Sequence, residues 1–158
     1  MSFMKKQAAG FWASLITLIL TVVSIIIYNV NIGSEGYFQG AVVANAMSYF
    51  LLASAMLIVV LVLAQVSLSG GVDKIISLIS DAMRIASPVC LVAGFINLVS
   101  SRIEGFAFIF FSNEEVLQEV QTAANLSSSS CAIANIVVLV LAIICGIIAA
   151  FFNMKKKA

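Results

Sequence analysis

Residues 10–28 read GFWASLITLILTVVSIIIY, nineteen residues without a single charge. A helix needs about 20 apolar residues to cross the hydrocarbon core of a bilayer, which is about 30 Å thick. Three further apolar stretches approach or exceed that length, at about 41–64, 85–100 and 130–152. The sequence therefore predicts an all-α membrane protein, a single domain (1–158) built as an antiparallel four-helix transmembrane bundle.

The composition excludes several other classes of protein. Of 158 residues, 63% are apolar and 9% are charged, whereas about a quarter is charged in soluble domains. A net charge of +1 is too small for the basic patch of a nucleic-acid binder. The chain has no histidine, the commonest general base and metal ligand. Most of the surface is therefore expected to face lipid.

The positions of the basic residues predict the orientation in the membrane. Seven of the eight fall on one side of the four spans: Lys5, Lys6, Lys74, Arg84, Lys155, Lys156 and Lys157. Arg102 stands alone on the other side, together with five of the seven acids. The positive-inside rule then predicts a multi-pass protein of the cell membrane with both termini in the cytoplasm. No small-x-small cleavage site follows the first span, so we expect that span to be retained.

The segment before the third span is amphipathic. Its polar residues recur at helical spacing: Asp73, Ser77, Asp81 and Arg84. We expect an interfacial helix over 72–84 on the cytoplasmic side, introduced by a turn at Gly70 and Gly71 and running into the third span. Arg84 would extend to the lipid headgroups. Pro88 predicts a bend, which is either a hinge or simply the entry of a surface helix into the membrane.

The outer loop over 101–129 is the least ordinary part of the chain. It supplies the residues that we predict to form an outer contact surface: Arg102, Glu104, Phe106, Phe108, Phe110 and Phe111. Residues 106–111 alternate aromatic side chains as a strand does, but a continued helix or a surface coil fits equally well. The segment would dock a partner, fold over the bundle as a lid, or lie among headgroups. A helix over 113–124 is expected to follow, with Ser112 as its cap and Glu115 completing a capping box.

Asparagines near the outer ends of three spans form a second candidate site. Asn45, Asn97 and Asn135 are expected to turn inward, because an amide side chain in lipid is costly unless it is paired. Such a polar cluster joins helices to one another, or it lines a vestibule for a small ligand.

Small residues are also spaced for close helix packing. Ala86, Cys90 and Gly94 recur every four residues in the third span, and the fourth and first spans carry similar stripes: Ala142, Gly146 and Ala150, and Ala9, Ala13, Thr17 and Thr21. These stripes predict close helix contacts. Cys90 and Cys145 are expected to be packing residues rather than a disulfide.

The spans contain no group suited to catalysis. No Asp, Glu, Lys or Arg falls within the expected hydrocarbon segments, and a Ser/His or Cys/His pair is impossible without histidine. We therefore expect no enzymatic activity, no cofactor and no metal site. The expected partners are membrane lipid and either a second copy of the chain or another membrane protein, and no nucleic acid.

Three outer segments, NIGSEGYFQG (31–40), RIEGFAFIFFSN (102–113) and EVLQEVQT (115–122), resemble those of small four-span membrane proteins of Gram-positive bacteria. That family has no assigned activity, so the resemblance implies an architecture and no function. Claudins and tetraspanins share the four-span plan, but their outer cysteines and tryptophan-based motif are missing here.

The sequence thus favours a non-enzymatic membrane protein that acts by assembly, as an accessory or scaffolding subunit with an aromatic outer contact surface. The alternative is a homo-oligomeric pore or small-solute carrier whose outer vestibule is lined by Asn45, Asn97 and Asn135.

Overall fold

The computed structural model describes residues 7–65 and 71–154, and the side chains of 71–73 lie outside the described set. Five helices form this part of the chain: α2 (Ala9–Gly33), α3 (Ala46–Leu63), α4 (Gly71–Phe111), α5 (Glu114–Val120) and α6 (Ala123–Phe151). Within the described ranges, α2, α3, α6 and the Lys74–Phe111 part of α4 are long and apolar enough to cross a membrane. The predicted all-helical class is confirmed, and the structure contains four helices that could serve as the predicted spans.

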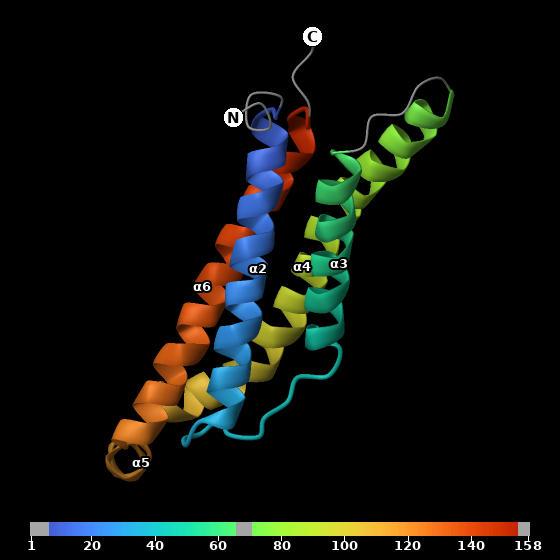
Figure 1. Cartoon of the computed structure of the whole chain (residues 1–158). Coiled ribbons are helices and arrows are strands. Elements are labelled where there is room, and N and C mark those ends of the chain that lie inside the picture. Colours follow the sequence, from blue (N-terminus) through green and yellow to red (C-terminus); the bar gives the residue numbers. More distant parts are fainter. Residues whose placement is uncertain (1–6, 66–70, 155–158) are drawn as a thin grey trace.

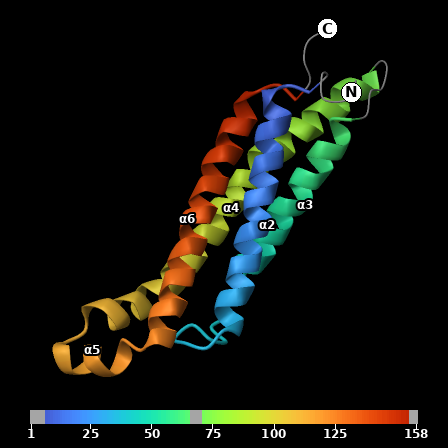
Figure 2. The same cartoon turned by 60° about the vertical axis from the view of Figure 1, so that its left-hand side comes forward.

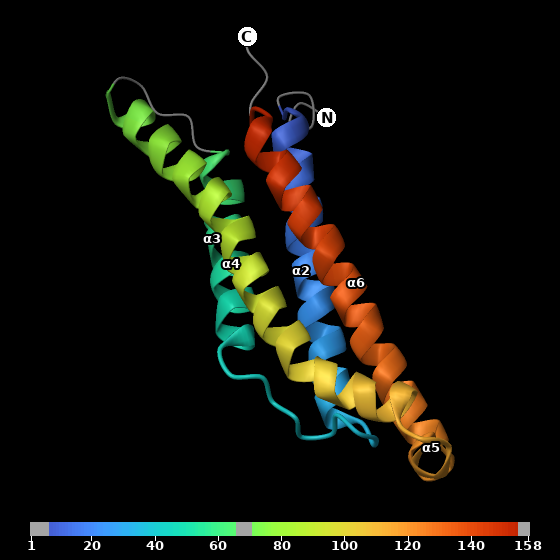
Figure 3. The ribbon, with the colours of Figure 1, turned by 180° about the vertical axis from the view of Figure 1, so that it is seen from behind.

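The long helices lie side by side and point in alternate directions along the chain (Figure 1). α2 packs along α6, α3 packs along α4, and α4 passes behind to contact α6 (Figures 2 and 3). α2 begins and α6 ends at one end of the molecule, which we call the terminal end, and α5 lies at the other, which we call the α5 end. At the terminal end the Ala8 backbone N–H donates to the Met154 carbonyl at 3.1 Å, so the two ends of the described chain are joined.

Small and polar residues form the contact between α2 and α6. The buried positions of α2 alternate in steps of three and four, apart from Phe11: Gly10, Ser14, Thr17, Thr21, Ser24, Tyr28 and Asn31. Those of α6 do the same from Ser128 to Ala149, apart from Ser129. A seven-residue repeat is typical of helices that cross at about 20°. The predicted every-fourth stripes are therefore only partly correct, because Ala9 is exposed and Ala13 and Ala150 are half-buried.

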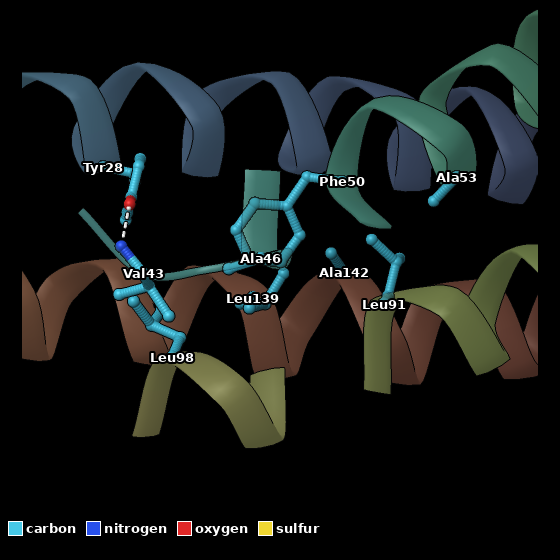
Figure 4. Packing of buried hydrophobic residues seen from close by; sticks show 9 residues of the cluster. All are labelled: Tyr28, Val43, Ala46, Phe50, Ala53, Leu91, Leu98, Leu139 and Ala142. Atoms are coloured by element: carbon cyan, nitrogen blue, oxygen red, sulfur yellow. Dashed lines mark hydrogen bonds between the residues drawn. The ribbon is translucent and has the colours of Figure 1, made fainter. Parts of the chain in front are cut away.

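The apolar core lies between all four long helices (Figure 4). Phe50 of α3 is fully buried and its ring points toward α6, near Leu139. The ring fits because α4 has Gly94 opposite it, where a Cβ atom would stand 2.5 Å from Phe50 Cε1. Gly94 thus belongs to a close contact, as its place in a small-residue stripe predicted.

α4 is much longer than the predicted third span. It has 41 residues, and at 1.5 Å per residue it is about 60 Å long, twice the thickness of a hydrocarbon core. The predicted interfacial segment is its beginning, and the helix continues through Pro88. Gly70 of the predicted turn lies outside the described residues. Residues 106–111, for which three conformations were open, are the helical end of α4.

The predicted outer loop over 101–129 is mostly helical, and its caps differ from the expected ones. α5 is capped by Asn113, whose Oδ1 accepts from the Val116 N–H at 3.0 Å. Ser112 instead donates its hydroxyl to the Phe108 carbonyl at 2.7 Å, because α4 reaches Phe111 and leaves that carbonyl within reach. The predicted 113–124 helix ends at Val120, and Thr122 caps the start of α6.

Candidate functional site

The α5 end of α4 contains Arg102, which was predicted to belong to a surface. Its side chain is only 1% exposed. Nη2 donates to the Ala41 carbonyl at 3.0 Å, and Cζ lies 4.5 Å from the centroid of the Phe38 ring. Both partners come from the segment between α2 and α3. The guanidinium is therefore covered by residues 34–45, and the prediction that Arg102 takes part in an outer contact surface is wrong.

Aromatic rings continue this contact along α4. Phe106 packs edge-on against Phe38 at 5.5 Å between centroids, and Phe108 lies 5.7 Å from Tyr37. These separations are those at which aromatic pairs attract each other. Gly105 makes room for them, since a Cβ atom there would stand 2.5 Å from Phe38 Cε1. The sequence contains every one of these rings, but no local pattern pairs segments about seventy residues apart.

Hydrogen bonds to α2 and α6 hold residues 34–45 in place. The Phe38 N–H donates to Ser128 Oγ at 3.3 Å. The same serine joins α6 to α2, because its carbonyl accepts from Asn31 Nδ2 at 2.7 Å. Further along, the Val43 N–H donates to the Tyr28 hydroxyl at 2.7 Å (Figure 4). Hydrogen bonds thus hold both halves of residues 34–45. We call this segment the cover, because it lies over the α5 end of α4.

Another side of the same turns of α4 is exposed and meets the cover only at the edge, where Phe108 lies beside Tyr37. Phe111 is 84% exposed, and Ile103, Glu104 and Phe108 are exposed as well. Phe108 follows Glu104 by four residues, and Phe111 follows Phe108 by three and Ile103 by eight. The four side chains therefore lie on one side of the helix, which we call the distal face. Of the predicted contact residues, Glu104, Phe108 and Phe111 lie on this face, and Phe106 and Phe110 are half-buried beside the cover.

The three predicted asparagines do not form one cluster. Asn135 is buried and accepts a hydrogen bond from Ser24 Oγ at 2.6 Å, across the contact of α2 and α6. Asn97 is half-buried on α4. Asn45 is exposed and lies before α3, which begins five residues later than the predicted span. No hydrogen bond joins any two of the three in the part of the chain that the structure describes.

Arg84, at the other end of the molecule, is buried rather than extended toward headgroups. Its Nη2 donates to the carbonyls of Ala149 and Phe152, and its Nη1 pairs with Asp81 at 2.9 Å. The last carbonyls of a helix lack partners within the helix and carry partial negative charge. Arg84 therefore caps the end of α6, which the sequence did not reveal because α6 is distant along the chain.

An apolar groove of about 450 Å³ lies beside this cap, between α4 and α6. Its walls are aliphatic and aromatic: Ile85, Pro88, Val89, Val92, Ile147, Ala150 and Phe151.

All three cysteines are free thiols and half-buried. The described residues contain no group of three side chains suited to hold a metal ion.

Comparison with known proteins found no relative of this chain. No family model, no curated protein and no solved structure matches this chain. The resemblance to small four-span proteins of Gram-positive bacteria stays a prediction, and the function has to be argued from the geometry.

Proposed function

We propose that this chain is a non-enzymatic, multi-pass protein of the cell membrane that acts by assembly, as an accessory or scaffolding subunit. In this proposal the four long helices form an antiparallel transmembrane bundle, with both termini in the cytoplasm and the α5 end outside. The distal face of α4 is the surface that contacts the partner, and the partner is another membrane protein.

The spacing of charges along α4 supports this placement. No charged residue lies between Arg84 and Arg102, and the eighteen steps between them correspond to about 27 Å of helix. This length is close to the 30 Å of a hydrocarbon core. Arg84 and Arg102 would then lie at its two edges, each buried in protein rather than in lipid. Lys74 and Arg84 belong to the part of α4 at the terminal end, and five further basic residues precede Gln7 or follow Met154 in the sequence, which favours the cytoplasm for that end.

The exposure of the distal face is the observation that carries the proposed function. Phe111 lies nine residues beyond Arg102, about 13 Å further along the helix axis. An exposed, largely apolar face on the part of a helix that extends beyond the membrane is typical of an interaction surface. It stands on a helix that is held from behind by the cover, so its shape is fixed before a partner arrives.

Co-purification in mild detergent tests this proposal. A tagged chain is expected to retain one specific membrane partner, and Phe111→Ser is expected to release it, because a ring at the centre of a small interface contributes about 2 kcal/mol or more. Phe151→Ser is the matched control, since Phe151 is equally exposed, at 84%, at the terminal end. That variant should keep the partner.

Transport activity would contradict the assembly role. The proposal predicts no solute flux through vesicles that contain the purified chain. Flux that disappears in Asn135→Leu, or a partner that Phe111→Ser and Phe151→Ser release equally, would overturn it.

A further inference from the structure

The charge of Arg102 has no counter-ion in the described part of the chain. A guanidinium has five N–H donors and keeps its proton. One donor on Nη2 reaches the Ala41 carbonyl, whereas Nε and Nη1 are buried without a partner. The one ion pair among the described residues joins Arg84 to Asp81, and Glu35 and Glu104 are exposed. A buried charge in this state is unfavourable until an anion pairs with it.

The part of the cover that lies over Arg102 is bracketed by two residues with left-handed backbone. Residues 41–44 supply both the Ala41 carbonyl and the Val43 N–H that bonds to Tyr28. Gly40 precedes them with φ +69°, and Asn45 follows them with φ +62°. Asn45 adopts this left-handed conformation without a capping hydrogen bond from its side chain, and a Cβ atom at Gly40 would meet nothing within 4 Å. Movement of residues 41–44 about these two positions would break the bond from the Ala41 N–H to the Phe38 carbonyl, at 3.1 Å, as well as the bonds to Arg102 and Tyr28. It would leave the bond from the Phe38 N–H to Ser128 in place.

We propose that Arg102 is the centre of a binding site for one small oxyanion, and that residues 41–44 close this site in the absence of the anion. A phosphate or carboxylate group matches the guanidinium geometry and would accept hydrogen bonds from Nε and Nη1. The Tyr28 hydroxyl, which interacts electrostatically with Arg102, accepts from the Val43 N–H, and because that bond does not use its own O–H, the hydroxyl can serve as a further donor to the anion. The oxyanion is supplied either by a free ion or by the headgroup of a lipid. This site is separate from the distal face, so it does not depend on the proposed assembly.

Thermal stability measured with matched probes tests the site. The purified chain, in an uncharged maltoside and phosphate-free buffer, is heated with inorganic phosphate, dioctanoylphosphatidic acid or dioctanoylglycerol. The two lipid probes differ from each other only in the phosphate group. At a hundredfold excess over Kd, a bound oxyanion is expected to raise the midpoint by about 5 to 10 °C. Arg102→Gln should abolish the shift, and Arg84→Gln should keep it, each relative to its own baseline.

Each outcome of this measurement has a defined meaning. A shift with inorganic phosphate supports a free ion as the source, and a shift with phosphatidic acid alone supports a lipid headgroup. The proposal is overturned by an equal shift with dioctanoylglycerol, by an undiminished shift in Arg102→Gln, or by no shift with either phosphate probe.

The movement of the cover has an independent readout. Val43→Cys, in a background where Cys90, Cys131 and Cys145 are replaced by alanine, places a thiol at a buried position of residues 41–44. Its labelling by a maleimide is expected to accelerate over the same range of oxyanion concentration that raises the midpoint. Ala53→Cys, buried in the core, should label at an unchanged rate. A raised midpoint without faster labelling of Val43→Cys would show that the site does not open in this way.

Discussion

Replacing Gly36 by alanine is expected to lower the free energy of unfolding by about 3 kcal/mol, the sum of a steric clash and backbone strain. Gly36 has φ +130°, a conformation that side chains with a Cβ atom rarely adopt. The added Cβ atom would also stand 2.6 Å from the Ala124 carbonyl oxygen and 2.6 Å from Ser128 Cβ. The cover cannot relax away without losing the hydrogen bond between Phe38 and Ser128.

The variant Gly40→Ala distinguishes the steric clash from the backbone strain. Gly40 also has a left-handed φ, of +69°, but a Cβ atom there meets nothing within 4 Å. This variant should lose only the conformational part, about 1 kcal/mol. Both are measured by titration with a denaturing detergent against the wild-type chain. Equal losses in the two variants would show that the cover does not pack against α6 at Gly36.

Replacing Arg84 by leucine is expected to destabilise the chain by about 3 kcal/mol, because hydrogen bonds to charged groups contribute about 1.5 to 3 kcal/mol each and are not additive. The substitution leaves the carbonyls of Ala149 and Phe152 without this donor at the end of α6. It also removes a positive charge from the negative end of the α6 dipole. The loss should appear in the same detergent titration.

Lys74→Leu is the control for the charge itself. Lys74 is an exposed basic residue near the beginning of α4, and its removal should change the free energy of unfolding by less than about 0.5 kcal/mol. If Arg84→Leu were as mild as this control, Arg84 would extend to the headgroups as the sequence first suggested, and the cap on α6 would be incorrect.

The apolar runs predicted the helices because their signal is local. Residues 10–28 fall within α2, and the predicted span 130–152 falls within α6 except for its last residue. The burial of Gly94 agrees with its place in a small-residue stripe. Helix ends were less predictable. Asn45 was placed inside a span, although it precedes α3 in a left-handed conformation that no hydropathy pattern reveals.

The candidate site was predicted only in part, because its main contacts join distant segments. Exposure of Phe108 and Phe111 could be expected from an aromatic run after a charged residue. The burial of Arg102 beneath Phe38 could not, since sixty-four positions separate them. The same holds for Arg84 and the end of α6. The sequence predicted that Arg84 extends to the headgroups and that Arg102 belongs to an outer contact surface, and only the packing of the chain shows that each is enclosed by protein.

Photo-crosslinking in intact cells tests the central claim most directly. A benzophenone side chain is introduced at position 111 or, as the matched control, at position 151, two phenylalanines that are each 84% exposed at opposite ends of the molecule. The proposed assembly predicts one discrete protein adduct from position 111, lost when Ile103 is also replaced by serine, and no such adduct from position 151. The absence of a protein adduct at position 111, or the same adduct from both positions, would contradict it.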